Sequence, residues 1–80
     1  MDTREMVALR FMRLCEERNL SINALATSAG IPRSTLKNIL YGKSKNPGIV
    51  TLKKLCDGLD ITLGEFFSTP EFDALEQEIQ

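Results

Sequence analysis

The sequence predicts an all-α domain built from five helices. Apolar residues recur three and four positions apart along most of the chain, which is the spacing of one side of a helix. No stretch alternates apolar and polar residues as a half-buried strand does, and glycine and proline separate the apolar stretches. Eighty residues allow one domain with a small core.

The first helix is predicted over residues 3–18. Asp2 is a suitable N-cap with Glu5 three residues behind it, and Asn19 ends the helix. The positions expected to face the core are Val7, Phe11, Leu14 and Cys15.

A second helix is predicted from the N-cap Ser21 to about residue 28, and a third over residues 32–40. Gly30 ends the second helix, because this stop needs a positive φ that glycine adopts easily. Pro32 suits the first turn of the third helix, where no N–H partner is needed. The turn is so short that the two helices cross at close range, with the small Ala26 at the contact. The inner positions are Ile22, Leu25, Ala26, Ala29, Ile31, Leu36 and Ile39.

After the third helix, Tyr41 and Gly42 precede a polar loop that is rich in helix breakers. An amphipathic fourth helix is predicted over about residues 50–58. Thr62 and Glu65 then form a capping box that opens a short fifth helix. The inner positions are Leu52, Leu55, Cys56 and Leu59 near the fourth helix, and Phe66 and Phe67 in the fifth.

Residues 69–80 are predicted to form a short acidic helical tail outside a domain of residues 1–68. Thr69 and Pro70 mark another helix start. Phe72, Leu75 and Ile79 lie on one stripe of that helix. The stripe could pack on its own domain, contact a second copy of the chain, or belong to a frayed end.

Charge is unevenly distributed along the chain. Residues 57–80 sum to −7, whereas the whole chain has a net charge of −1. Because salt screens a charge beyond about 8–10 Å, phosphates respond to the local charge more than to the net charge. The middle of the chain therefore favours a polyanionic partner. Residues 18–56 contain no acidic residue and seven basic ones, which are Arg18, Arg33, Lys37, Lys43, Lys45, Lys53 and Lys54.

One side of the third helix is polar and free of acidic residues. An arginine there can make paired hydrogen bonds to guanine O6 and N7, and an asparagine can pair with adenine. Each such contact discriminates between bases by about 1–3 kcal/mol. The alternative is a helix side that only faces solvent. The residues on this side are Arg33, Ser34, Lys37, Asn38 and Tyr41.

Catalysis finds no support in the residue types. The chain has no histidine, no glycine-rich phosphate loop followed by lysine, and no paired carboxylates in an apolar setting. Cys15 and Cys56 lack metal-ligand spacing and are expected to be buried free thiols. No apolar run approaches the ~20 residues of a membrane span, and the start does not look like a secretory signal. We therefore expect a cytoplasmic protein with no catalytic site, metal or cofactor.

In the two helices joined by the turn at Gly30 and in the segments around them, the sequence resembles the Cro/repressor-type (Xre-like) helix-turn-helix proteins of phages and bacteria, over about residues 9–67. The resemblance implies a five-helix, lambda-repressor-like fold, with residues 32–40 as the recognition helix in the major groove of double-stranded DNA. The shared pattern includes Leu25-Ala26, Gly30-Ile31-Pro32, Ser34-Thr35-Leu36, Gly42-Lys43, Asn46-Pro47 and Leu59-Asp60-Ile61.

The resemblance also implies roles for individual residues. Base contacts fall to Arg33, Ser34, Lys37 and Asn38. Phosphate contacts fall to Ser21, Thr35, Tyr41, Lys43 and Lys45.

Three features depart from the family pattern. Ile22 stands where many members have a glutamine that touches phosphate, so that contact is in doubt. Cys15 and Leu40 stand where many members bury an arginine and its acidic partner. Since both of these sites are apolar here, no lone charge is left in the core. The acidic tail lies outside the family pattern.

These observations predict a sequence-specific transcriptional regulator that acts as a repressor. We expect a bacterial or phage-encoded protein that is associated with the nucleoid. One domain of this size covers only about 600–1,000 Å² on DNA, which favours a homodimer on two half-sites about 34 Å apart. Its contacts are expected near residues 61–67 and along the tail. The rival hypothesis is a protein-interaction module of the same fold, such as an antitoxin or accessory regulator, that binds a protein partner through its basic surface or its acidic tail.

Overall fold

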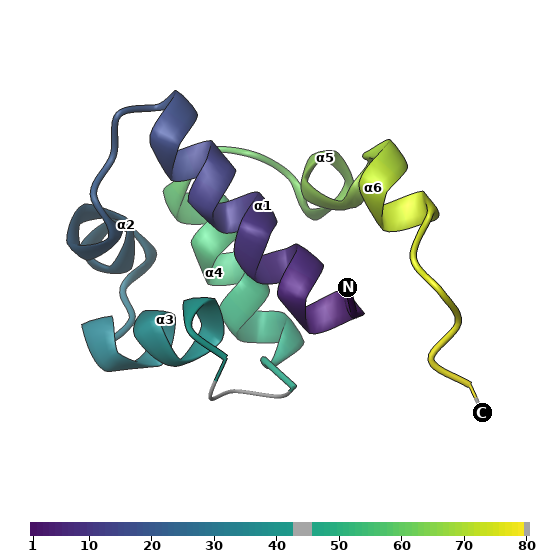
Figure 1. Ribbon diagram of the computed structural model, residues 1–80. Helices are drawn as coiled ribbons and strands as arrows, with labels where there is room; N and C mark the ends of the chain where they lie inside the picture. The colour runs from purple at the N-terminus through teal and green to yellow at the C-terminus, as the bar shows by residue number, and fades with distance from the viewer. Residues whose placement is uncertain (43–45, 80) are drawn as a thin grey trace.

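The computed structural model describes residues 1–42 and 46–79, which fold into helices without a strand (Figure 1). The prediction of an all-α, five-helix domain with a short C-terminal helical segment is confirmed. The helices of the described part are α1 (Thr3–Glu17), α2 (Ile22–Ala29), α3 (Arg33–Leu40), α4 (Ile49–Gly58), α5 (Leu63–Phe67) and α6 (Pro70–Asp73).

Side-chain caps begin the helices where the sequence places them. The carboxylate of Asp2 accepts a hydrogen bond from the Glu5 N–H at 2.8 Å, and the Glu5 carboxylate accepts one from the Asp2 N–H at 3.4 Å. Thr62 and Glu65 make the same reciprocal pair at the start of α5. These bonds satisfy N–H groups that have no partner inside their own helix.

The predicted helix ends are off by one residue at several places. Pro32 is the N-cap of α3 instead of its first helical residue, because it is extended (φ −62°, ψ 144°) while its carbonyl accepts the first helical hydrogen bonds. Arg18 is the C-cap of α1, and α4 begins at Ile49. Gly30 has the predicted positive φ, at 69°.

The core lies where α1, α2, α3, α4 and α5 meet. Gly58 at the end of α4 lets that helix approach α2, because a Cβ placed on it would lie 3.0 Å from the backbone nitrogen of Ala29. This contact makes α2 and α4 the most extensively paired helices of the bundle. The side chains with no exposed surface are Phe11, Leu25, Ala26, Leu36, Leu55, Cys56 and Phe66.

The tail is only partly helical. Phe72 in α6 packs on Phe66 and Phe67, with ring centres 5.8 and 4.9 Å apart, and joins the core. The predicted single stripe is not formed, because the helix ends at Asp73: Phe72 packs on its own domain, whereas Ile79 is 84% exposed, as expected of a frayed end. Acidic residues at and beyond this C-terminus disfavour a longer helix, since they lie at the negative end of its dipole. The predicted division into a domain of residues 1–68 and a tail of residues 69–80 stays a prediction.

Candidate nucleic-acid interface

Helix α3 lies at the edge of the bundle (Figure 1), and the residues on its exposed side are polar. Its opposite side is held by Leu36, Ile39 and Leu40, which are at most 5% exposed. Contacts with α1 and α2 fix the helix from two directions. Rigid support of this kind keeps a reading side chain in one orientation. The side chains that α3 leaves exposed are Arg33, Ser34, Lys37 and Asn38.

The cations of α3 are available for an external anion. Among the described residues the ion pairs join Arg13 to Glu71 and Lys53 to Asp57, and neither involves α3. The nearest acidic residues in sequence, Glu17 and Asp57, lie in α1 and α4. A phosphate or base edge would therefore meet Arg33 and Lys37 without displacing a carboxylate.

Three of the residues predicted to face phosphates lie in the described part of the chain. Ser21 caps α2 by accepting the Ala24 N–H at 3.0 Å, and its hydroxyl proton stays free to donate to an anion. Tyr41 at the end of α3 is 60% exposed, and Thr35 is half-buried. Lys43 and Lys45, also predicted to contact phosphate, lie outside the described residues.

A small cavity of about 160 Å³ lies between α3 and the start of α4. Thr35 and Asn38 line it from α3, while Asn46 and Thr51 approach from the other side. Sequence reasoning did not assign Asn46 and Thr51 to the interface. The breaker-rich loop signalled that Asn46 is exposed, but only the fold brings Asn46 and Asn38 to the same cavity.

The first turn of α4 carries exposed apolar side chains that sequence reasoning also missed. Ile49 and Val50 are 66% and 65% exposed. The segment in which dimer contacts were expected is more enclosed, since Phe66 is buried and Ile61 and Phe67 pack against the core.

Two arginines serve the fold itself. Arg10 donates from Nε to the carbonyl oxygen of Phe66 at 3.0 Å and from Nη2 to that of Glu65 at 3.2 Å. Arg18 donates to the carbonyl oxygen of Leu59, the C-cap of α4. A cation is favourable there, because the C-terminus of a helix carries partial negative charge. Arg18 is thus committed to α4, although it belongs to the basic middle of the sequence.

The other features to consider are the two cysteines, potential metal ligands and potential membrane spans. Cys15 and Cys56 are buried free thiols, and burial raises the pKa of both, with the Asp57 carboxylate adding to the effect on Cys56. Within residues 1–42 and 46–79, no group of three or more potential ligands could hold a metal ion. Over the same ranges, no helix is long and apolar enough to cross a membrane.

Comparison with known proteins places this geometry in a family. Residues 10–71 match the Cro/C1-type HTH DNA-binding domain. The chain is 39% identical over 59 residues to the HTH-type transcriptional regulator SlrR of Bacillus subtilis (strain 168). That match covers 72% of this chain and 39% of SlrR, so the chain spans well under half of this relative.

Solved structures agree in fold. The prophage Lp1 protein 11 superposes with a TM-score of 0.81 at 38% identity, covering 94% of this chain and all of that one. A chain of the SinR protein/SinI protein complex gives 0.71 at 26% identity, covering 90% of this chain and 69% of that one.

Proposed function

The chain belongs to the Cro/C1-type helix-turn-helix family of DNA-binding domains, and from this premise we propose that it represses transcription by occupying a specific double-stranded DNA sequence. Helix α3 enters the major groove and its exposed polar side reads base edges. The observation that carries the proposal is this acid-free side on a helix whose other side is fully anchored.

The four exposed polar residues of α3 contact the base edges and give the sequence specificity. Arg33 lies in the first turn and reaches guanine, whereas Asn38 lies beside the small cavity and reaches adenine. Ser34 and Lys37 lie between them on the same side. The free donors of Arg33 and Lys37 support this assignment, since neither is neutralised within the described chain.

Phosphate contacts flank the reading helix and fix its position on the duplex. Ser21 with the first turn of α2 contacts one strand, and Thr35 and Tyr41 contact the phosphates beside α3. Lys43 and Lys45 extend these contacts as a prediction from sequence.

The protein acts as a homodimer on two half-sites one helical turn apart. One α3 reads too few base pairs for high specificity, and a single domain covers only about 600–1,000 Å² on DNA. Analytical ultracentrifugation with and without a two-site duplex tests this assembly, and a 1:1 complex on the full site overturns it.

The alternative function is binding of a protein partner. One solved neighbour is a chain of the SinR protein/SinI protein complex, so a protein of this fold is found in a protein assembly. The basic surface or the acidic tail would provide the surface for such a partner. Under this alternative, Arg33→Ala leaves DNA binding unchanged and lowers partner capture by the basic surface.

Fluorescence anisotropy with a labelled duplex tests the proposed function. Because the dimer loses one arginine at each half-site, Arg33→Ala should weaken binding by roughly 30- to 25,000-fold, which corresponds to the loss of about 2–6 kcal/mol of base contact. Lys53→Ala is the charge-matched control, because it removes one positive charge from a residue of α4 that is already paired with Asp57. If about five phosphates are neutralised per protomer, log K should fall against log[salt] with a slope of ~−9 for the dimer. A slope near zero contradicts the proposal.

A further inference from the structure

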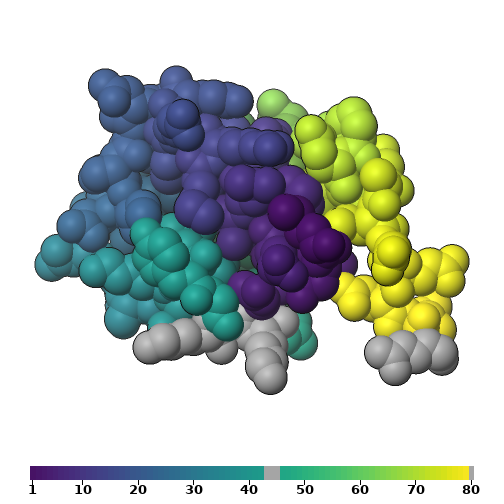
Figure 2. Space-filling model, viewed as in Figure 1, coloured from purple at the N-terminus to yellow at the C-terminus, as the bar shows by residue number. Residues whose placement is uncertain are grey.

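The residues after α6 run back to the start of α1. The carboxylate of Glu78 accepts a hydrogen bond from the Thr3 N–H at 3.3 Å, across 75 positions of sequence. Thr3 is the first residue of α1, whose N–H has no partner inside the helix, and a negative charge is favourable at that end. In Figure 2 the first turn of α1 lies between the end of α3 and the yellow tail.

A second link holds α6 to the side of α1. The guanidinium of Arg13 lies 3.9 Å from the carboxylate of Glu71, and both side chains are about half exposed. Exposed pairs at this distance contribute little stability. The polar contacts on the two sides of Phe72 are therefore weak, and the described residues after Phe72 are not part of the core cluster.

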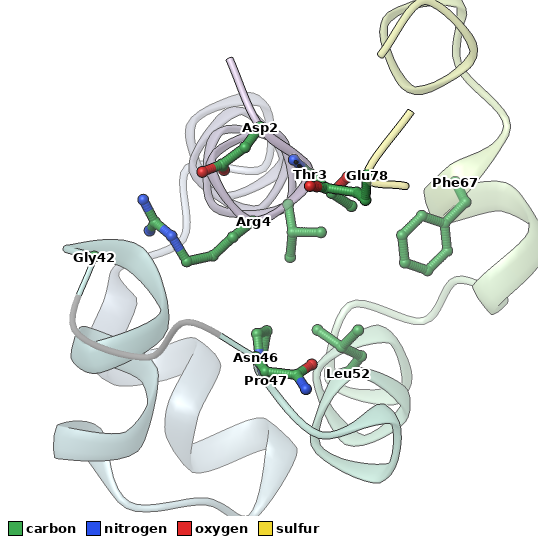
Figure 3. A pocket seen from close by; sticks show the side chains of 10 residues that line it. Asp2, Thr3, Arg4, Gly42, Asn46, Pro47, Leu52, Phe67 and Glu78 are labelled. Carbon is green, nitrogen blue, oxygen red and sulfur yellow. Dashed lines mark hydrogen bonds between the residues drawn. The ribbon is translucent and has the colours of Figure 1, made fainter. Parts of the chain in front are cut away.

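Glu78 stands at the rim of a cavity of about 520 Å³ (Figure 3). Arg4 lines another side, with its guanidinium beside Gly42, since a Cβ built on that glycine would lie 3.5 Å from Nη1. Leu52 and Phe67 provide apolar lining. The cavity thus brings together the tail, the start of α1 and the residue that follows Tyr41.

The same cavity shares two residues with the small cavity beside α3. Asn46 and Pro47 line it, and both residues also line the small cavity beside Asn38. Asn46 and Pro47 therefore lie between the cavity that Glu78 lines and the cavity that Asn38 lines.

We propose that residues 74–79 form an acidic strap that attenuates DNA binding by docking Glu78 on α1 and placing negative charge across the cavity from Gly42, Asn46 and Pro47, at the edge of the DNA-binding face. The strap repels DNA phosphates that approach this edge. This inference rests on the proposed function and adds a regulatory element to it.

If the strap attenuates DNA binding, removing negative charge from it should raise the affinity for DNA more than removing the same charge elsewhere. The double variant Glu76→Gln and Glu78→Gln removes two negative charges from the strap. The control variant Glu16→Gln and Glu17→Gln removes two from exposed positions at the far end of α1, so both proteins have the same net charge. Binding to one labelled duplex is measured at 50 mM and 300 mM salt.

At 50 mM salt the strap variant should bind DNA about three- to tenfold more tightly than the control variant, and the difference should disappear at 300 mM. Equal affinities for the two variants overturn the strap while leaving the proposed function intact. If wild type and both variants all fail to bind DNA, the proposed function fails and the strap with it.

An NMR measurement tests the docking contact independently of affinity. The amide signal of Thr3 should shift in Glu78→Ala, because its hydrogen-bond acceptor is lost. Addition of DNA to the wild-type protein should move that signal in the same direction, as the strap is released. A Thr3 signal unchanged by Glu78→Ala overturns the proposal.

Discussion

Arg10 and Phe66 are joined twice: the arginine Nε donates to the phenylalanine carbonyl oxygen at 3.0 Å, and the guanidinium carbon lies 5.8 Å from the centre of its ring. The second donor of Arg10 takes the carbonyl oxygen of Glu65. Because Phe66 is fully buried against Phe11, this arginine fixes α5 onto α1 from the solvent side.

The first prediction concerns this link. Arg10→Ala should lower the free energy of unfolding by about 2 kcal/mol, because two carbonyl oxygens lose a charged donor. Arg13→Ala should cost less than about 0.5 kcal/mol, since its ion pair is exposed. Urea denaturation followed by circular dichroism measures both, and equal losses would argue against the structural role of Arg10.

Gly58 should not tolerate a methyl group. Gly58→Ala places a Cβ 3.0 Å from the Ala29 nitrogen and 3.2 Å from its Cα, and backbone atoms cannot move aside cheaply. We expect a net loss of about 1–2 kcal/mol despite the better helix propensity of alanine. In Gly64→Ala the nearest atom is 3.7 Å away, so this control should be neutral or stabilising. A Gly58→Ala protein as stable as the Gly64→Ala control refutes the close approach.

The capping box of α5 should make stability depend on pH. The hydrogen bond from the Thr62 N–H lowers the pKa of the Glu65 carboxyl. A lowered pKa contributes stability above the pKa of the unfolded chain, and this contribution is lost as pH falls through the folded value. Between pH 7 and pH 3 the wild type should therefore lose more stability than Glu65→Gln. Parallel losses in the two proteins would show that the cap does not titrate.

Both cysteines should resist alkylation in the folded protein. Burial raises the pKa of Cys15 and Cys56, so little thiolate forms near neutral pH, and both side chains are at most 6% exposed. Iodoacetamide at pH 8 should modify them only at the rate of unfolding, and quickly in urea. Rapid modification of either thiol without urea contradicts the buried positions.

Most helix boundaries could be predicted from local signals in the sequence. Asp2, Ser21 and Thr62 cap helices through side chains within three residues, and Gly30 stops one through its own φ. Such features depend on neighbouring residues alone and can be read directly. The end of α6 at Asp73 could not be read in this way, because the helical spacing of Phe72, Leu75 and Ile79 predicts a longer helix.

In the candidate interface, too, some features could be predicted from sequence and others depend on the fold. Periodicity places Arg33 and Asn38 on the exposed side of α3, as the structure does. The approach of Asn46 to Asn38 and the bond between Thr3 and Glu78 join distant parts of the chain. The commitment of Arg18 to Leu59 likewise required the fold, since in sequence it is one more basic residue.

Selection from a random library of double-stranded DNA, with wild type beside Arg33→Ala, tests the central claim most directly. We predict that wild type enriches a two-fold symmetric motif with half-sites about ten base pairs apart, and that Arg33→Ala loses it. No enrichment by the wild-type protein, or the same motif enriched equally by Arg33→Ala, would contradict reading of DNA by α3.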